Sequence, residues 1–175
     1  MDNKQITGKI ISRLKKRYPD AKCSLNFKNP LELLIATVLS AQCTDERVNK
    51  VTKDLFRKYK TAKDYARARP GVLEDDIRST GFYKNKTRSI INCCKKITQN
   101  HGGSVPATLE ELVKLDGIGR KTANVILGNV FDTPGITVDT HVKRISNRLG
   151  LSENQDPVKI CLLYTSDAAD DLVSV

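Results

Sequence analysis

Apolar residues recur at helical spacing along most of the chain. A first predicted helix opens after Asn29-Pro30, and its inward face has five apolar residues at i, i+3, i+4, i+7 and i+8: Leu31, Leu34, Ile35, Val38 and Leu39. The next helix has Asp45 as its predicted N-cap and three apolar residues at helical spacing: Val48, Val51 and Leu55. Pro70-Gly71 and Thr80-Gly81 then interrupt the chain on either side of a short segment over 73–79.

Two further helices follow the second break, and the longer one ends near His101-Gly102-Gly103. Its inward face has four apolar residues: Ile90, Ile91, Cys94 and Ile97. Thr108 is the predicted N-cap of the other helix, with Glu111 at the capping-box position. Its apolar face has three residues: Leu109, Leu112 and Val113. Because the connections are short and only the stretch 135–138 has an extended pattern, we predict an all-α fold.

Charge is distributed unevenly between the body of the chain and its end. The 175 residues contain 30 Lys and Arg against 20 Asp and Glu, which makes the net charge +10. Residues 1–150 have a net charge of +14, whereas residues 151–175 have a net charge of −4. A strongly positive body attracts polyanions, so nucleic acid is the leading class of partner. A surface that is basic only for solubility is the alternative.

The composition is that of a globular protein, with 39% hydrophobic and 29% charged residues. No apolar run approaches the roughly 18 residues of a membrane span, and no apolar signal core follows Met1, so we expect no membrane association. The five cysteines are an odd number and are expected as reduced thiols in the cytoplasm. They contain no C-x-x-C pair, so a zinc or iron–sulfur site built from them is not expected.

The most informative segment is LVKLDGIGRKTANVILGNV, residues 112–130. Gly117 and Gly119 frame a tight turn, where missing Cβ atoms and positive φ angles let backbone N–H groups approach an anion. Ile118 can pack between the two flanking helices, and the second helix begins at Arg120 with its positive dipole end. These are the features of a helix-hairpin-helix, which grips a DNA phosphate without reading bases. An ordinary connection in a helical bundle is the alternative, but the basic residues after the turn favour phosphate binding.

Lys121 and Asp139 are the candidate catalytic residues. A lysine amine can attack an electrophilic sugar carbon and form a Schiff base, although a plain phosphate contact is the simpler role for Lys121. Asp139 begins a predicted helix that closes at Gly150 and has three inward apolar residues: Val142, Ile145 and Leu149. The carboxylate of Asp139 either only caps this helix or also stabilises an oxocarbenium-like sugar or shuttles protons. His141 has no second ligand nearby and is expected to be structural rather than metal-binding.

Four motifs occur together in the order found in a known family. The runs LDGIGRKTANVILGNVF and ITVDTHVKRISNRLG resemble the endonuclease III branch of the helix-hairpin-helix DNA glycosylases. The run NPLELLIATVLSAQCTDERVNKV is similar to the N-terminal core of that family, and IRSTGFYKNKTRSII is similar to its minor-groove loop. The resemblance covers about residues 6–160 and implies the fold of that family.

This resemblance implies a role for individual residues. Lys121 would be the Schiff-base nucleophile and Asp139 the catalytic carboxylate. Gln42 would fill the hole left by an extruded base, and Phe82 would be the apolar wedge beside the target pair. Together with the hairpin, these residues make up the candidate DNA-binding set: Gln42, Phe82, Gly117, Ile118, Gly119, Arg120, Thr122 and His141.

The resemblance also implies an activity. It implies a bifunctional base-excision repair enzyme, which removes oxidised pyrimidines from duplex DNA and then cuts the strand at the abasic site by β-elimination. The expected partner is double-stranded DNA with damaged bases or abasic sites, bound by a monomeric, nucleoid-associated enzyme in the cytoplasm. No external cofactor is needed for this chemistry. The family usually holds a [4Fe–4S] cluster with four C-terminal cysteines spaced C-x6-C-x2-C-x5-C, which this sequence lacks, so no cofactor and no metal are expected.

The family architecture implies two helical lobes. Residues 23–133 would form a helical barrel that includes the hairpin at about 109–130, and residues 1–22 with 134–160 would form a second, incomplete lobe. Residues 161–175 are an atypical tail that we expect to be foreign or disordered, with a native acidic tail as the alternative. On this interpretation the chain is truncated at its C-terminus. A non-catalytic hairpin module that only binds DNA and an inactive fragment that aggregates are the competing hypotheses.

Overall fold

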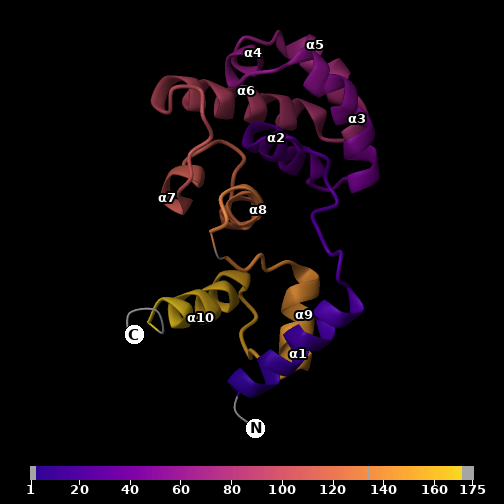
Figure 1. Ribbon diagram of the computed structural model, residues 1–175. Coiled ribbons are helices and arrows are strands. Elements are labelled where there is room, and N and C mark those ends of the chain that lie inside the picture. The colour runs from indigo at the N-terminus through magenta and orange to yellow at the C-terminus, as the bar shows by residue number, and fades with distance from the viewer. Residues whose placement is uncertain (1–2, 134, 171–175) are drawn as a thin grey trace. The chain divides into compact units, whose positions relative to one another are not determined.

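The computed structural model describes residues 3–133 and 135–170, with side chains over 5–133 and 135–163. These residues form helices, turns and loops without a strand, which confirms the predicted all-α fold. Ten α-helices and one 3-10 helix are described (Figure 1): α1 (Asn3–Arg17), α2 (Pro30–Ser40), α3 (Asp45–Lys58), α4 (Ala62–Ala66), α5 (Pro70–Ile77), η1 (Arg78–Thr80), α6 (Tyr83–Asn100), α7 (Leu109–Leu112), α8 (Arg120–Val130), α9 (Thr140–Arg148) and α10 (Pro157–Asp170). None of the described helices is long and apolar enough to cross a membrane.

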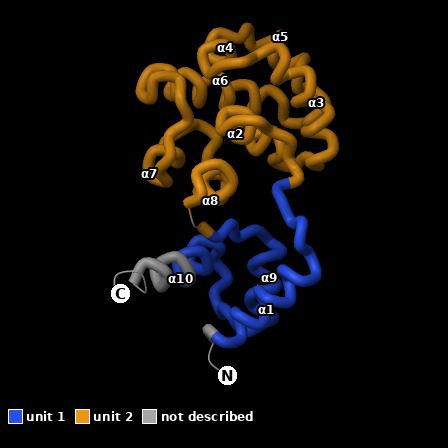
Figure 2. The backbone as a smooth tube through the Cα atoms, in the orientation of Figure 1, with its two compact units in different colours: residues 1–23, 136–175 blue, residues 24–135 orange. Residues whose placement is uncertain are grey.

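The chain divides into two compact units (Figure 2). The central unit consists of residues 24–135 and contains the helices from α2 to α8. The terminal unit consists of residues 1–23 and 136–175 and combines α1 with α9 and α10. Helices from both ends of the chain thus belong to the same unit, although the whole central unit separates them in sequence.

Helix α2 is the best-buried element of the central unit. It packs against α3, α6 and α8, and five of its side chains have no accessible surface: Leu33, Leu34, Ile35, Ala36 and Leu39. A helix surrounded by other helices is apolar all round, which is why its burial extends beyond the predicted one-sided face. On that face, Leu31 is only half-buried. The four inward residues predicted for α6 are all buried, as expected.

Local hydrogen bonds determine where the helices begin. Pro30 opens α2, and the side chain of Asn29 caps it by accepting a hydrogen bond from the N–H of Glu32. The predicted N-cap of α3 at Asp45 is wrong, because the hydroxyl of Thr44 accepts the capping hydrogen bond. Asp45 is instead the first residue inside the helix, where its negative charge is favourable at the positive end of the dipole. Its carboxylate also accepts a hydrogen bond from Ser24.

The terminal unit has a small core. Val138, Ile160 and Cys161 are buried together, and Ile136 packs against them half-buried. The inward face predicted for α9 is wrong, because its three apolar residues have exposed fractions of 37%, 50% and 44%: Val142, Ile145 and Leu149. Amphipathic spacing identifies a face that can be buried, but only neighbouring elements can bury it. No described side chain covers this face of α9 well enough to do so.

Helix α10 crosses residue 161, where the sequence predicts the start of an atypical tail. The helix runs from Pro157 to Asp170, and Cys161 belongs to the buried core. The helix thus includes residues 161–170 of that segment, and its foreign or disordered character stays a prediction. Residues 171–175, the end of that predicted tail, lie outside the described residues.

Candidate nucleic-acid interface

The predicted hairpin connects α7 to α8 in the central unit. Thr108 caps α7 as expected by accepting a hydrogen bond from the backbone N–H of Glu111. The prediction for Val113 is wrong, because this residue lies beyond the end of α7 and is exposed. Ile118 is only 5% exposed, and its N–H donates to the carbonyl of Leu115 at 3.2 Å. The turn is therefore a closed, internally bonded segment.

The two glycines of the turn have different structural roles. Gly117 has a φ of +80°, and a Cβ atom there would lie 2.9 Å from the Cβ atom of Ser89 in α6. Only glycine fits this position without strain. Gly119 has an extended backbone with φ −93°, and a Cβ atom there would meet open space. It is the N-cap of α8 and has no side chain to occupy the first-turn N–H groups, which leaves the positive end of α8 open to an anion.

Two residues of α6 hold the hairpin in place, and the sequence analysis did not single them out. Ser89 forms the close contact to Gly117. Lys96 donates from Nζ to the carbonyl of Lys114 at 2.9 Å and lies 2.8 Å from the carboxylate of Asp116. Both residues are polar members of a helical sequence, and nothing in the local pattern connects them to a turn that follows α7.

Lys121 lies in the first turn of α8, on an exposed position. The opposite side of the helix is buried through four residues: Ala123, Asn124, Ile126 and Leu127. Arg120 and Thr122 flank Lys121 and are half-buried. An amine at this position is accessible to a large ligand and sits beside the open helix terminus, so it can reach a sugar next to a bound phosphate.

Gln42 and Phe82 share an unusual backbone conformation. Gln42 follows the end of α2 with a φ of 53°, and Phe82 precedes α6 with a φ of 47°. Left-handed backbone at a residue other than glycine costs about 1–2 kcal/mol, and such strain concentrates at functional sites. Both side chains are exposed, and 62% of the surface of Phe82 is accessible. An exposed aromatic residue on a strained turn is suited to insertion into a ligand.

Asp139 and His141 lie in the terminal unit, at the start of α9. Oδ1 of Asp139 accepts hydrogen bonds from the N–H groups of His141 at 3.0 Å and Val142 at 2.8 Å, which confirms that it caps α9. Nδ1 of His141 lies 3.3 Å from Nη2 of Arg144, and the His141 side chain is exposed. The structure thus gives Asp139 a fixed orientation within its own unit, and Lys121 belongs to the other unit.

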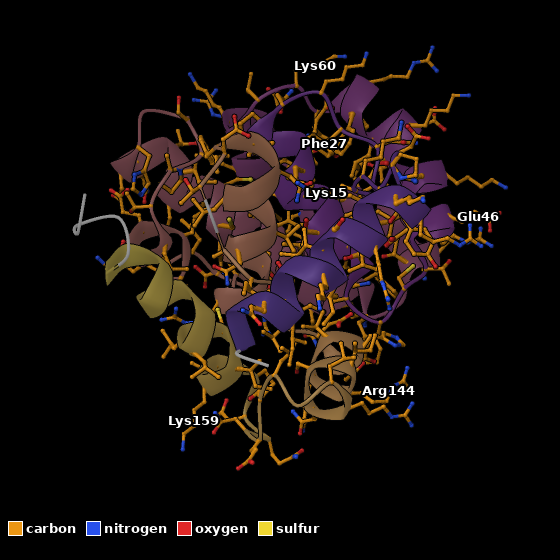
Figure 3. All side chains as sticks on the ribbon, turned by 60° about the horizontal axis from the view of Figure 1, so that its bottom comes forward. Lys15, Phe27, Glu46, Lys60, Arg144 and Lys159 are labelled. Carbon is orange, nitrogen blue, oxygen red and sulfur yellow. The ribbon has the colours of Figure 1, made fainter. Side chains whose placement is uncertain are left out.

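Basic side chains extend outward from both units. Lys60 of the central unit and Arg144 and Lys159 of the terminal unit point away from the ribbon (Figure 3). Residues of α9 and the following loop also line a shallow pocket of about 400 Å³: Thr140, Lys143, Arg144, Asn147, Arg148 and Gln155. Three cationic side chains around a shallow pocket are typical of a surface that contacts phosphate.

The cysteines of the described chain do not fit an iron–sulfur cluster. No group of three or more His, Cys, Asp or Glu side chains is placed to hold a metal ion among the described residues. Cys93 and Cys94 are buried in α6, and burial raises the pKa of the Cys93 thiol to about 12 and also raises the pKa of the Cys94 thiol. Cluster ligands are thiolates, whereas these two thiols stay protonated at neutral pH.

Thiol reactivity checks this arrangement. In the native protein, we expect Cys23 and Cys43, which are half-buried, to react with an aromatic disulfide reagent at least ~10-fold faster than Cys93 and Cys94. The two α6 thiols should become reactive only in denaturant, because burial blocks access to them and raises their pKa. Absorbance gives the rates, and peptide mass spectrometry locates the modified residues. Rapid native modification of Cys93 or Cys94 would contradict their burial.

Comparisons with known proteins agree with this geometry. Residues 35–163 match the model of the HhH-GPD superfamily of base excision DNA repair proteins. The chain is 51% identical over 158 residues to an endonuclease III of Synechocystis sp., a match that covers 90% of this chain and 72% of that relative. It is 50% identical over 141 residues to an endonuclease III of Bacillus subtilis, with 81% of this chain and 64% of that relative covered.

Solved structures give the same result. The fold is similar to that of an endonuclease III in a non-covalent complex with DNA, with a TM-score of 0.88 and 46% sequence identity. The match covers 95% of this chain and 78% of that one. A trapped covalent intermediate of endonuclease III with DNA matches with the same values. An all-α chain with this hairpin, family model and set of relatives belongs to the endonuclease III family, within the HhH-GPD superfamily of base-excision DNA repair proteins.

Proposed function

We propose that Lys121 and Asp139 carry out the DNA glycosylase and abasic-site lyase chemistry of this endonuclease III family member. The substrate is double-stranded DNA that contains an oxidised pyrimidine or an abasic site. The protein acts as a monomer on the DNA of the nucleoid, in the cytoplasm. The observation that carries the proposal is the exposed position of Lys121 in the first turn of α8. This helix follows a hairpin turn in which only glycine fits at position 117 without strain.

DNA binding starts from the phosphate backbone. The uncapped N-terminus of α8 binds a phosphate through its backbone N–H groups, and Arg120 and Thr122 lie beside it. These contacts fix the register of the protein on the duplex without reading a base sequence. The net charge of +14 over residues 1–150 supports such binding at low salt.

The damaged base must leave the helical stack before it can react. Extrusion costs a few kcal/mol, and a weakened base pair costs less. Phe82 acts as an apolar wedge next to the target pair, and Gln42 occupies the space of the extruded base, which offsets part of this cost. The exposure of both side chains on strained turns supports these roles.

The chemistry follows from a lysine amine and a carboxylate. Nζ of Lys121 attacks C1′ of the sugar as the bond from C1′ to the base breaks, and the base leaves with the proton that the amine loses. Asp139 stabilises the positive charge that develops on the sugar in this step. Opening of the sugar ring gives an imine between Nζ and C1′, which makes the proton on C2′ acidic. Loss of that proton expels the 3′ phosphate by β-elimination, and water then hydrolyses the imine and frees Lys121.

Borohydride trapping on a duplex with one abasic site tests the proposed function. Borohydride reduces the imine to a stable amine, so we expect a covalent protein–DNA adduct that survives denaturing electrophoresis. A steep, saturable salt dependence of duplex binding without any adduct would instead indicate a DNA-binding module without catalysis. Absence of both binding and adduct would contradict the DNA-binding hairpin as well.

The variant Asp139→Asn separates capping from catalysis. An asparagine oxygen can still accept the two hydrogen bonds at the start of α9, so the free energy of unfolding should change by less than about 0.5 kcal/mol. The negative charge is lost, and base excision should fall by about 100-fold. Single-turnover excision and urea unfolding measure the two effects.

The matched control is Asp139→Ala, which removes both the cap and the charge. It should lose excision to the same extent and about 1 kcal/mol of stability in addition. If Asp139→Asn excises bases at the wild-type rate, the carboxylate is only a cap and the catalytic role of Asp139 is wrong.

A further inference from the structure

Lys86 is a buried cation in the first turn of α6. It is only 5% exposed, and its ammonium group donates to two backbone carbonyls, those of Leu39 and Thr80, both at 2.8 Å. Burial lowers the pKa of Lys86 from its usual value, because the charged form has lost most of its contact with water. Lysine is rarely buried this deeply, and an apolar side chain of similar length would fill the space without a desolvation cost.

The two carbonyls belong to the segments that lead into Gln42 and Phe82. Leu39 lies in the last turn of α2, three residues before Gln42, and Thr80 ends η1, two residues before Phe82. Since both oxygens bind the same nitrogen atom, they lie within two hydrogen-bond lengths of each other. One ammonium group therefore sets the spacing between the backbones that carry the two exposed side chains.

No other described hydrogen bond performs this task. The remaining backbone bonds of the two turns are local: the Cys43 N–H donates to the Ser40 carbonyl, the Gly81 N–H to that of Arg78, and the Lys86 N–H to that of Phe82. The side-chain bonds are local too: Ser40 donates to the Thr37 carbonyl, Thr80 to that of Ile77, and Arg78 to the hydroxyl of Tyr83. Among the described residues, the side chain of Lys86 makes the only hydrogen bonds that join the end of α2 to the turn between η1 and α6.

We propose that Lys86 is a positioning residue for base extrusion: its ammonium group holds Gln42 and Phe82 at the separation at which both enter the duplex at one base pair. The proposal rests on the proposed function, which gives Gln42 and Phe82 their roles in the duplex. Lys86 is shielded from solvent and acts only through the backbones of the two turns. Its contribution belongs to the extrusion step and not to the chemistry at C1′.

The variant Lys86→Met tests this role, because it keeps an unbranched side chain that is only one atom shorter and removes its charge and donors. Excision of an oxidised pyrimidine from a duplex requires extrusion, and we expect its rate to fall about 10- to 100-fold, as for other small displacements of positioning groups. β-Elimination on a single-stranded oligonucleotide with an abasic site requires no extrusion, and its rate should stay within about twofold of the wild type.

Two control variants accompany this measurement. Lys95→Met removes an exposed lysine from the same helix and should leave both rates unchanged. Ile97→Val truncates a fully buried α6 side chain that makes neither of the two hydrogen bonds, and it should lower Tm without separating the two substrates. If Lys86→Met does not fold, Lys86→Gln takes its place, because its amide keeps hydrogen-bond donors on a side chain as long as that of methionine. We expect the same difference between excision from a duplex and β-elimination on a single strand.

Fluorescence of 2-aminopurine placed beside the lesion reports unstacking without any chemistry. The wild type should raise the fluorescence on binding, and Lys86→Met should raise it much less at saturating protein. Three results for Lys86→Met would each overturn the proposal: an equal loss of rate on duplex and single-stranded DNA, excision at the wild-type rate, or a rise in fluorescence equal to that of the wild type. A wild type that unstacks the base more than Lys86→Met does, but forms no adduct and excises nothing, would contradict the proposed function and support the positioning role. A wild type that does not unstack the base would overturn the positioning role.

Discussion

Replacing Lys121 by alanine is expected to abolish the covalent DNA adduct and to slow strand cleavage at an abasic site by about 10³-fold or more. The amine is the only group in the proposed mechanism that bonds to C1′, and β-elimination depends on the imine that it forms there. Lys121 is exposed, and its removal leaves the buried face of α8 unchanged, so the fold should persist. Borohydride trapping and single-turnover cleavage on the same abasic duplex measure the effect.

Lys114→Ala is the matched control for this variant. Lys114 is also an exposed lysine of the hairpin region, and its contact to Lys96 is made by the backbone carbonyl, which the substitution keeps. It should trap DNA as the wild type does, with a modest loss of affinity at low salt. An adduct of Lys121→Ala at the wild-type level would show that another amine is the nucleophile.

Replacing Gly117 by alanine is expected to lower the free energy of unfolding by about 2–5 kcal/mol and to weaken DNA binding. About 1–2 kcal/mol comes from forcing an alanine into left-handed backbone, since φ is +80° at this position. Another 1–3 kcal/mol comes from overpacking, because the new Cβ atom would lie 2.9 Å from the Cβ atom of Ser89. Urea unfolding and a salt titration of duplex binding measure the two consequences.

Two further variants separate these contributions. Gly119→Ala adds the same methyl group to extended backbone with open space around it, and it should cost only about 0.5–1 kcal/mol, because alanine is a poorer N-cap than glycine. The double variant Gly117→Ala with Ser89→Gly removes the close contact between the two Cβ atoms but keeps the backbone strain at residue 117. After the effect of Ser89→Gly alone is subtracted, it should recover only part of the free energy of unfolding that Gly117→Ala loses. Stability of Gly117→Ala equal to that of the wild type would contradict the described turn.

Local sequence patterns predicted those helices whose position and ends depend on residues close together in the chain. Apolar spacing placed α2 and α6, and the side chain of Thr108 caps α7 as predicted. The error at the start of α3 also has a local cause. Thr44 and Asp45 are adjacent, and either residue type can be an N-cap, so the sequence does not indicate at which of them the helical backbone begins. The expected helix start at Arg120 is correct for the same reason, since Gly119 ends one element and α8 begins the next.

The hydrophobic pattern overestimated burial in the terminal unit. The spacing of Val142, Ile145 and Leu149 in α9 is as regular as that in α6, yet these side chains are exposed and the α6 residues are buried. In the central unit, α6 packs against α2, α4 and α5. Periodicity describes one helix, whereas burial depends on how many elements surround it, and that number is a property of the folded chain.

The sequence by itself therefore determined the all-α class, the starts of α2, α7 and α8 and the position of the hairpin turn, because each depends on residues close together in the chain. Lys121 is proposed as the nucleophile from the family resemblance and not from local spacing. Only the tertiary structure decided what holds these parts in place. Ser89 meets Gly117, Lys96 bonds to Lys114, and Lys86 bonds to Leu39 across large sequence separations. Such contacts leave no periodic or spacing signal, because they depend on the packing of α6 against its neighbours, which exists only once the chain has folded.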